Sequence, residues 1–242
     1  MSSHIILSKH FTLHMKKITF ILTCLLLGTF SLQSCLNDTA YTSENLLFAI
    51  GTIRVIEKQD YYFELDEGSR LYPNDTTAVH NYPIKDNQRA FVYFSLLEEK
   101  LSDYEFNAKI EHIEDILTKD IYCCNQAEKL DSIGNDRIDV DNIWLSQDHI
   151  NIVYKFYHSN NPEKKHMLNL ILNEAAKTSN DEYLHLEFCH NAYNDTPLQS
   201  GTGIVSFKLD NIRQQLNANK GLCIVVNTLY EGTKTFIIEK NH

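Results

Sequence analysis

Hydrophobic and polar residues alternate along the chain from residue 50 onward, and alternation with period two is typical of half-buried β-strands. In the first stretch Ile53 and Val55 share one face, with Arg54 on the other. About five strands in roughly 65 residues, without a crossover helix, predict a small closed barrel of the OB type. The further strands are expected at residues 61–65, 88–97 and 106–110, with a loop between Pro73 and Pro83.

The second half of the chain repeats the β pattern, with turn signals between short apolar runs. Seven short strands in ~100 residues predict an immunoglobulin-like β-sandwich, although the sequence lacks the Cys…Trp…Cys spacing of true immunoglobulin domains. We expect a weak helix near residues 211–219. A short helix before the sandwich is capped by Asn125 and ended by Gly134, and the domain boundary lies near residue 138. The expected strands are residues 144–145, 149–157, 166–173, 183–190, 203–209, 222–229 and 234–239.

The first 35 residues have the layout of an export signal. Met15 is followed by Lys16-Lys17, by an apolar run over residues 18–30 and by a small residue before Cys35. The apolar run of about 13 residues is shorter than the ~20 needed for a membrane-spanning helix. We therefore expect residues 1–34 to be a cleaved signal peptide, with Met15 as the translation start and Met1 as the alternative.

The segment Leu32-Gln33-Ser34-Cys35 resembles a bacterial lipobox, in which the cysteine becomes the new N-terminus and carries acyl chains. Several acyl chains anchor a protein stably where a single chain does not. By the common sorting rule, Leu36 after the cysteine favours the outer membrane, with the periplasmic leaflet and the cell surface both left open. We expect a lipidated tether over residues 35–47, the barrel with its helical linker over 48–137 and the sandwich over 138–242.

The charge balance changes when the signal is removed. The whole chain has 22 Lys and Arg against 32 Asp and Glu, a net charge of −10. Residues 1–34 contain three lysines and no acid, so the mature chain of 208 residues carries −13. This acidic balance excludes a general nucleic-acid binder, which needs a basic surface. The expected contacts are the membrane, through the lipid anchor, and an unknown protein or glycan, and no cofactor is expected.

An ordered set of short motifs runs through the whole mature chain. The motifs are Ile50-Gly51-Thr52, Tyr61-Tyr62-Phe63 with Leu65-Asp66-Glu67-Gly68, Gln88-Arg89 with Phe91-Val92, Asp115-Ile116-Leu117-Thr118-Lys119, Asp131-Ser132-Ile133-Gly134, Trp144, Leu186-Glu187-Phe188 with His190-Asn191-Ala192, and Gly203-Ile204-Val205-Ser206-Phe207. Together they resemble the NigD-like lipoproteins of Bacteroidetes-type bacteria. The resemblance implies an N-terminal OB-like domain and a C-terminal β-sandwich, and Cys189 stands where it would place an arginine. It implies no established activity, but a family name taken from a bacteriocin-associated operon suggests an immunity or accessory role.

Four cysteines remain in the mature chain after Cys35 is used for lipid: Cys123, Cys124, Cys189 and Cys223. The adjacent pair Cys123-Cys124 would point to opposite sides of a strand, which does not suit a zinc site. No metal site is therefore expected. A disulfide to Cys189 or Cys223 stays open in an oxidising envelope, with burial as thiols the favoured alternative.

His185, Glu187 and Cys189 share one face of an expected strand and formally provide a nucleophile, a base and an orienting acid. Alternate residues on one strand are ~6.5–7 Å apart, which fits hydrogen-bonded catalytic geometry poorly. The apolar residues between them would face the core. We therefore favour a polar or partly covered outer face and keep a hydrolase as the alternative.

Five residues are the candidates for ligand contact. Tyr62 and Tyr93 are the rings of the barrel expected to point outward, and aromatic faces of OB folds can stack sugars or bases. His190, Asn191 and Tyr193 lie where a strand passes into a loop, a common position for binding residues. The alternatives are that most of the barrel's rings form the core and that Asn and Asp residues shape a hairpin turn.

The sequence lacks the nucleophile-elbow, Walker A, zinc-protease and EF-hand signatures. We therefore expect a non-catalytic lipoprotein of the cell envelope with a binding or accessory role. The alternatives are a bacteriocin immunity-type protein at the membrane and an uncharacterised hydrolase.

Overall fold

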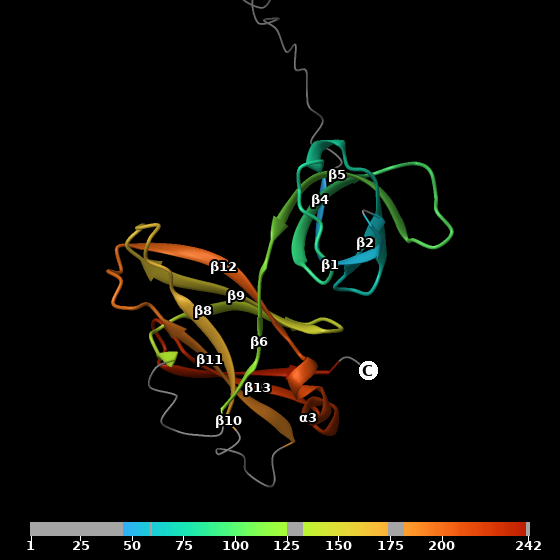
Figure 1. The fold of residues 1–242 in the computed structure, drawn as a ribbon. Coiled ribbons are helices and arrows are strands. Elements are labelled where there is room, and N and C mark those ends of the chain that lie inside the picture. Colours follow the sequence, from blue (N-terminus) through green and yellow to red (C-terminus); the bar gives the residue numbers. More distant parts are fainter. Residues whose placement is uncertain (1–45, 59, 125–132, 174–181, 241–242) are drawn as a thin grey trace, which may run out of the picture. The chain divides into compact units, whose positions relative to one another are not determined.

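A computed structural model describes residues 46–58, 60–124, 133–173 and 182–240 of the chain (Figure 1). The expected signal peptide, Cys35 and most of the expected tether lie outside these residues, as does the expected helix cap at Asn125. In the described ranges, no helix is both long and apolar enough to cross a membrane.

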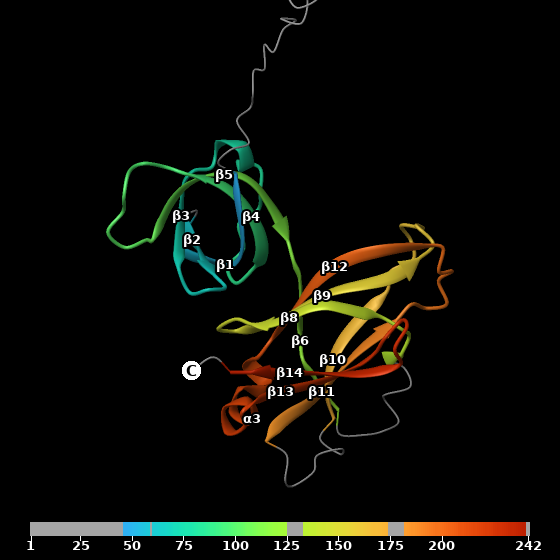
Figure 2. The same ribbon diagram turned by 180° about the vertical axis from the view of Figure 1, so that it is seen from behind.

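Five strands close into a barrel in the order β1-β2-β3-β5-β4. The long strand β1 closes it, because one part pairs with β2 and an overlapping part pairs with β4 (Figures 1 and 2). The pairs are antiparallel except for β3 with β5. The OB-type barrel is confirmed. Its strands are β1 (Leu47–Glu57), β2 (Asp60–Leu65), β3 (Arg70–Asp75), β4 (Arg89–Leu96) and β5 (Phe106–Asp115), with the short 3-10 helix η2 (Thr77–Val79) after β3.

The inside of the barrel follows the alternation in the sequence. In β2, Tyr61, Phe63 and Leu65 are buried, whereas Tyr62 and Glu64 point outward. Burying a large apolar side chain contributes roughly 1.5–3 kcal/mol. The expectation that most rings of this half form its core therefore holds for Tyr61 and Phe63.

The strand β3 extends into the first residues of the expected loop between Pro73 and Pro83. Pro73 lies inside β3, a position that the sequence analysis assigned to a loop between two prolines. Proline lacks the backbone N–H of a sheet ladder, so it is confined to strand edges, ends and bulges. Here β3 pairs with β2 only through Arg70 and Leu71, and its register with β5 shifts between Pro73 and Asp75. The missing donor therefore costs no ladder bond to β2.

The C-terminal half is a β-sandwich of two mixed sheets (Figure 2). One sheet has the order β14-β13-β11-β10-β7 and the other β6-β12-β9-β8. Three of the pairs are parallel: β6 with β12, β7 with β10 and β11 with β13. The all-β prediction of a barrel followed by a sandwich is confirmed. The strands are β6 (Leu117–Asp120), β7 (Tyr122–Cys124), β8 (Asp139–Leu145), β9 (His149–His158), β10 (Met167–Asn173), β11 (Tyr183–Asn191), β12 (Gln199–Lys208), β13 (Gly221–Asn227) and β14 (Thr233–Glu239).

The first two strands of the sandwich precede the expected boundary near residue 138. β6 pairs with β12 and β7 pairs with β10, so residues 117–124 belong to the sandwich sheets and not to the end of the barrel. Ile121 between the two strands is buried in the sandwich core. The strands have four and three residues, which is too short for a period to show in the sequence.

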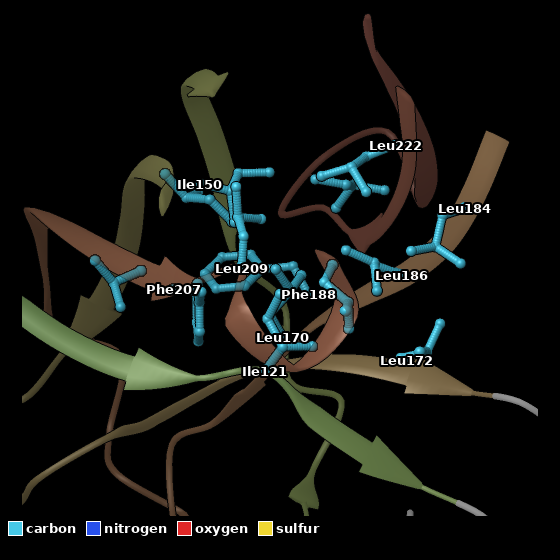
Figure 3. Close-up of a cluster of buried hydrophobic side chains, with 14 of the residues drawn as sticks. Ile121, Ile150, Leu170, Leu172, Leu184, Leu186, Phe188, Phe207, Leu209 and Leu222 are labelled. Atoms are coloured by element: carbon cyan, nitrogen blue, oxygen red, sulfur yellow. The ribbon is translucent and has the colours of Figure 1, made fainter. Parts of the chain in front are cut away.

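The sandwich core lies between the two sheets (Figure 3). Leu184, Leu186 and Phe188 point inward from β11 and meet Ile150 and Phe207 from the opposite sheet. The rings of Phe188 and Phe207 pack edge to face with centroids 6.1 Å apart, the geometry that aromatic pairs favour. The predicted inner face of this strand is confirmed.

The weak helix expected near residues 211–219 is present. It begins as the 3-10 helix η5 (Asp210–Ile212) and continues as α3 (Arg213–Ala218). Ile212 and Leu216 are buried in the sandwich core, so packing stabilises a helix that is too short to persist alone.

Candidate functional site

A pocket of about 470 Å³ lies at one end of the sandwich. Its size is within the ~300–1,000 Å³ range of ligand clefts. Both sheets contribute, because Tyr157 lies near the end of β9 and His190 near the end of β11. The pocket is lined by Asp136, Arg137, Tyr157, His190, Ala192, Asp195, Pro197, Leu229 and Tyr230.

The rim of the pocket presents aromatic and charged side chains. The hydroxyls of Tyr157 and Tyr230 are 2.7 Å apart and share a hydrogen bond, while 73% of Tyr230 is exposed to solvent. Arg137 donates from Nη1 to the carbonyl of Leu229 at 3.4 Å and is otherwise turned toward solvent. Tyr and Arg are the side chains that most often dominate binding energy at protein interfaces.

A chain of hydrogen bonds joins two residues of the pocket lining, His190 and Asp195, through His166. Nδ1 of His166 lies 2.9 Å from Nε2 of His190, and Nε2 of His166 lies 3.1 Å from Oδ2 of Asp195. Nδ1 of His190 lies 3.2 Å from the carbonyl oxygen of Arg137. The side chains of His166 and Asp195 are 8% and 4% exposed, and His190 is 2% exposed. We call His166, His190 and Asp195 the histidine relay.

The hydrogen-bond partners at the two ends of the relay determine which ring nitrogens there carry a proton. A carbonyl only accepts, so Nδ1 of His190 carries a proton. Hydrogen bonds from Ser159 hold the pKa of the Asp195 carboxyl well below its usual range, so it is ionised and Nε2 of His166 donates to it. The contact between Nδ1 of His166 and Nε2 of His190 needs one donor. Burial lowers the pKa of His190, which favours the neutral form of that ring.

This assignment predicts an NMR signature. Long-range ¹⁵N–¹H spectra at pH 7 should show His190 as the neutral Nδ1–H tautomer, because burial lowers its pKa and Nδ1 faces the carbonyl oxygen of Arg137, which only accepts. A His190 ring that carries its proton on Nε2 alone would contradict the assignment.

The loop after β11 is a tight turn. The amide of Asp195 donates to the carbonyl of Ala192 at 2.9 Å, and Tyr193 and Asn194 have φ values of 49° and 58°. Asn tolerates this left-handed region better than most residues, whereas a Tyr there is uncommon. The structure therefore agrees with a turn shaped by Asn and Asp, and the same turn places Asp195 against the relay.

Of the three candidates at the end of β11 and in this turn, His190 lines the pocket, and Asn191 and Tyr193 do not. Asn191 lies against Gly134, where an added Cβ would come within 2.6 Å of the asparagine side chain. Gly134 has φ of 85°, so glycine is needed there both for the backbone and for the space. Tyr193 donates to the sulfur of Met167 at 3.4 Å. A ligand role for Asn191 or Tyr193 stays a prediction.

The two tyrosine candidates of the barrel point outward as expected but do not join the pocket. Tyr62 packs against Tyr104 with ring centroids 5.8 Å apart, and the guanidinium of Arg70 lies 5.6 Å from its ring. Tyr93 packs against Phe48 on the outer face of β1 and β4. Neighbouring side chains thus cover part of both rings, and a ligand role for Tyr62 or Tyr93 stays a prediction.

The His185, Glu187 and Cys189 face does not form a nucleophilic site. His185 is exposed, but Cys189 is buried with Ile133 and Ile171 in a small cluster. Burial, with a smaller contribution from Glu187, raises the pKa of the Cys189 thiol to about 12, whereas nucleophilic catalysis needs the thiolate. Cys189 is a free thiol and Cys223 is also buried. Over the ranges that the structure describes, no group of three His, Cys, Asp or Glu side chains could hold a metal ion.

A second polar cluster links the barrel to the sandwich. Arg89 is 1% exposed and forms a two-pronged ion pair with Asp66, with Nη1–Oδ1 and Nη2–Oδ2 distances of 2.6 and 3.0 Å. Nη2 of Arg89 also donates to Oδ1 of Asn151 at 2.8 Å. Trp144 donates from Nε1 to Oδ2 of Asp66 at 2.9 Å, and Ser206 donates to Oδ1 of Asn151 at 2.6 Å. We call these five residues the interdomain network.

The sequence analysis identified His190 but missed His166, Asp195 and the rim residues Arg137 and Tyr230. A usable signal was the strand pattern, because residues 166–173 and 183–190 were both expected strands. In the structure β10 and β11 pair antiparallel with Leu168 opposite His190, which brings His166 beside His190. Choosing that pairing from the sequence requires a register that the alternation alone does not define.

Two family models together match almost all of the described chain. The model described as the NigD-like N-terminal OB domain matches residues 50–116. The model described as the NigD-like C-terminal β-sandwich domain matches residues 121–240. The chain belongs to the NigD-like family. The resemblance seen in the sequence motifs is therefore confirmed, and the second match begins close to β6 and β7 and not near residue 138.

Solved structures share the fold of this NigD-like chain over 81% of its length. A toxin-related protein from Parabacteroides distasonis is 30% identical with a TM-score of 0.65, over 94% of its own chain. A NigD-like immunity protein from Bacteroides caccae is 15% identical (TM-score 0.56, 93% of its chain). A protein from Bacteroides fragilis described as a lipoprotein is 11% identical (TM-score 0.62, 98% of its chain). A search of curated proteins finds no match.

Four motif positions of this NigD-like chain meet in the interdomain network. Asp66 follows β2, Arg89 begins β4, Trp144 lies in β8 and Ser206 lies in β12. The carboxylate of Asp66 joins the first three, and Ser206 is joined through Asn151. Their position gives these motifs a structural explanation: they hold polar groups of the barrel and the sandwich together. Neither Arg89 nor Trp144 lines the sandwich pocket.

Proposed function

We propose that the chain is a non-catalytic lipoprotein of the cell envelope, anchored through Cys35, that holds a protein partner at the sandwich pocket. The observation that carries this proposal is the pocket itself. It combines an exposed Tyr230 and an exposed Arg137 with an apolar lining that includes Leu229 and Pro197. Binding hot spots at protein interfaces are enriched in Tyr and Arg around an apolar centre, and this pocket has the same composition.

The chemistry of the relay supports binding over catalysis. Both ring nitrogens of His166 and of His190 face hydrogen-bond partners within the protein. A general base must reach the substrate with an available ring nitrogen. The relay instead holds the wall of the pocket in one conformation. This preorganisation lowers the entropic cost of ordering the wall when a partner binds.

The lipid anchor is supported by the sequence around Cys35, which follows a signal-like segment directly. The Bacteroides fragilis protein described as a lipoprotein shares the fold. We place the mature chain at the outer membrane, with the lipidated cysteine ahead of the barrel. An immunity role is the alternative that the family name suggests, and the structural neighbour from Bacteroides caccae carries that description.

Site-specific cross-linking in the bacterium that encodes the chain tests the pocket. Benzoylphenylalanine in place of Tyr230 should give a specific protein adduct on irradiation, because this ring lies at the pocket rim. The same probe in place of Tyr183 is the matched control, since the hydroxyl of Tyr183 donates to Glu239 outside the pocket. Mass spectrometry then identifies the adduct.

The outcome separates the alternatives. Identical adducts at both positions, or none at Tyr230, would contradict a protein-binding pocket. An adduct with a bacteriocin would select the immunity role. Glycan-array binding that is lost in Tyr230→Ala but kept in Tyr183→Ala would replace the protein partner with a glycan.

A further inference from the structure

Four large apolar side chains are exposed at one end of the barrel. Leu46 precedes β1, Leu47 and Phe48 begin it, and Leu96 ends β4. These strands are antiparallel, with Phe48 opposite Tyr93, so the start of β1 lies beside the end of β4. The exposed fractions are 52% for Leu46, 44% for Leu47, 70% for Phe48 and 50% for Leu96. We call these four residues the entry patch.

The outer side of the patch is aromatic. The ring of Phe48 packs against that of Tyr93 with centroids 6.2 Å apart, and His112 lies on the far side of Tyr93 at 5.8 Å. An apolar surface rimmed by an amphipathic aromatic residue is typical of protein that meets the membrane interface, where tyrosine is enriched. Several large apolar side chains exposed at one end of a small domain indicate a contact surface.

The short segment between Cys35 and Leu46 keeps the entry patch close to the lipid anchor. Cys35 lies eleven residues before Leu46. At ~3.3–3.6 Å per residue, that segment spans at most about 40 Å in any conformation. An acylated Cys35 therefore keeps the entry patch permanently near the bilayer, whereas a diffusing partner or a second copy has to be recruited. The tether gives the bilayer a high effective concentration at this end of the barrel.

We propose that the entry patch lies against the lipid bilayer and holds the barrel to the membrane surface beside the anchor. This inference rests on the lipid anchor of the proposed function. Leu47 and Phe48 supply apolar contacts with the acyl boundary, and Tyr93 lies at the headgroup level. The lipid then fixes both the position of the chain and the end of the barrel that faces the membrane.

Quenching of tryptophan fluorescence by brominated lipid tests the contact. The full lipidated chain is placed in phosphatidylcholine vesicles whose acyl chains either carry bromine or do not. The variant Phe48→Trp should lose emission in brominated vesicles because its indole enters the bilayer. The matched control Ile237→Trp replaces another exposed apolar residue, 50% exposed on β14 of the sandwich, and should not lose emission. Trp144 is the single native tryptophan, so the unmodified chain supplies the background.

The possible results are distinguishable. Equal emission of Phe48→Trp in both vesicle types, with the chain still floating with the vesicles, overturns the contact and leaves the anchor intact. A second result also overturns the membrane contact. If Phe48→Trp shows no quenching, and the chain forms a dimer in detergent that Phe48→Ser abolishes, the patch binds a second copy of the chain. If mass spectrometry finds no acyl chain on Cys35, and Cys35→Ala floats like the unmodified chain, the anchor and the inference fail together.

Discussion

Replacing Arg89 with methionine should lower the free energy of unfolding by about 3–5 kcal/mol, because removing one partner of a buried ion pair leaves the other charge uncompensated. Asp66 would keep its negative charge among the buried groups of the interdomain network, and Asn151 would lose a donor to its side-chain oxygen. The methionine fills most of the space of the arginine stem, so the loss reflects charge and hydrogen bonding more than a cavity. Urea denaturation of the chain measures it.

Two further variants make this prediction specific. Arg54→Met removes an arginine that is 25% exposed and pairs with Glu64 and Asp148, so it should cost only about 1 kcal/mol or less. The double variant Arg89→Met with Asp66→Asn removes both charges and keeps an oxygen for Trp144. It should be more stable than Arg89→Met alone. Equal losses for Arg89→Met and Arg54→Met would refute a structural role for the network.

Lowering the pH from 7 to 5 should destabilise the chain by about 2 kcal/mol through His149 alone. This histidine is buried at the start of β9. Burial, assisted by the positive charge of Arg89, lowers the pKa of His149 to about 4 against the opposing effect of Asp148 and Asp66. Between pH 6.5 and 4 the unfolded chain binds a proton that the folded chain does not, so the stabilising contribution is complete above pH 6.5 and is lost below it.

The variant His149→Gln isolates this contribution, since glutamine has a similar size and does not titrate. Chemical denaturation of both chains at several pH values between 7 and 4 gives the difference in stability. The difference should shrink as the pH falls, because only the unmodified chain pays for protonating a buried ring. Parallel pH dependence of the two chains would show that another group governs acid sensitivity.

The strand pattern predicted the fold because most strands have one buried and one exposed face. Phe63 in β2 and Leu186 in β11 are both buried between exposed or half-exposed neighbours, and the alternation shows this directly. The errors occur where that physical basis is missing. β6 and β7 are too short to show an alternating pattern in the sequence. Pro73 lies in β3 although proline is usually unfavourable inside a strand.

The candidate site was only partly predictable because it depends on residues that converge from distant positions. His166 and His190 are 24 residues apart, and His166 and Asp195 are 29 apart. Arg89 and Asn151 are 62 apart. Local sequence patterns carry no information on such pairs without a strand register. His190 was predicted as a ligand contact, and in the structure it is a buried residue that belongs to both the relay and the pocket lining.

The early position of β6 and β7 in the chain has a consequence for the order of folding. A chain is synthesised from its N-terminus, and domains generally fold in that order. The barrel is complete once β5 has emerged, but β6 must wait for β12 and β7 for β10. Until then both short strands expose unpaired edges, which favour association with other chains. Lys119 and Asp120 place charges on the waiting β6, and charge on an edge strand opposes such premature pairing.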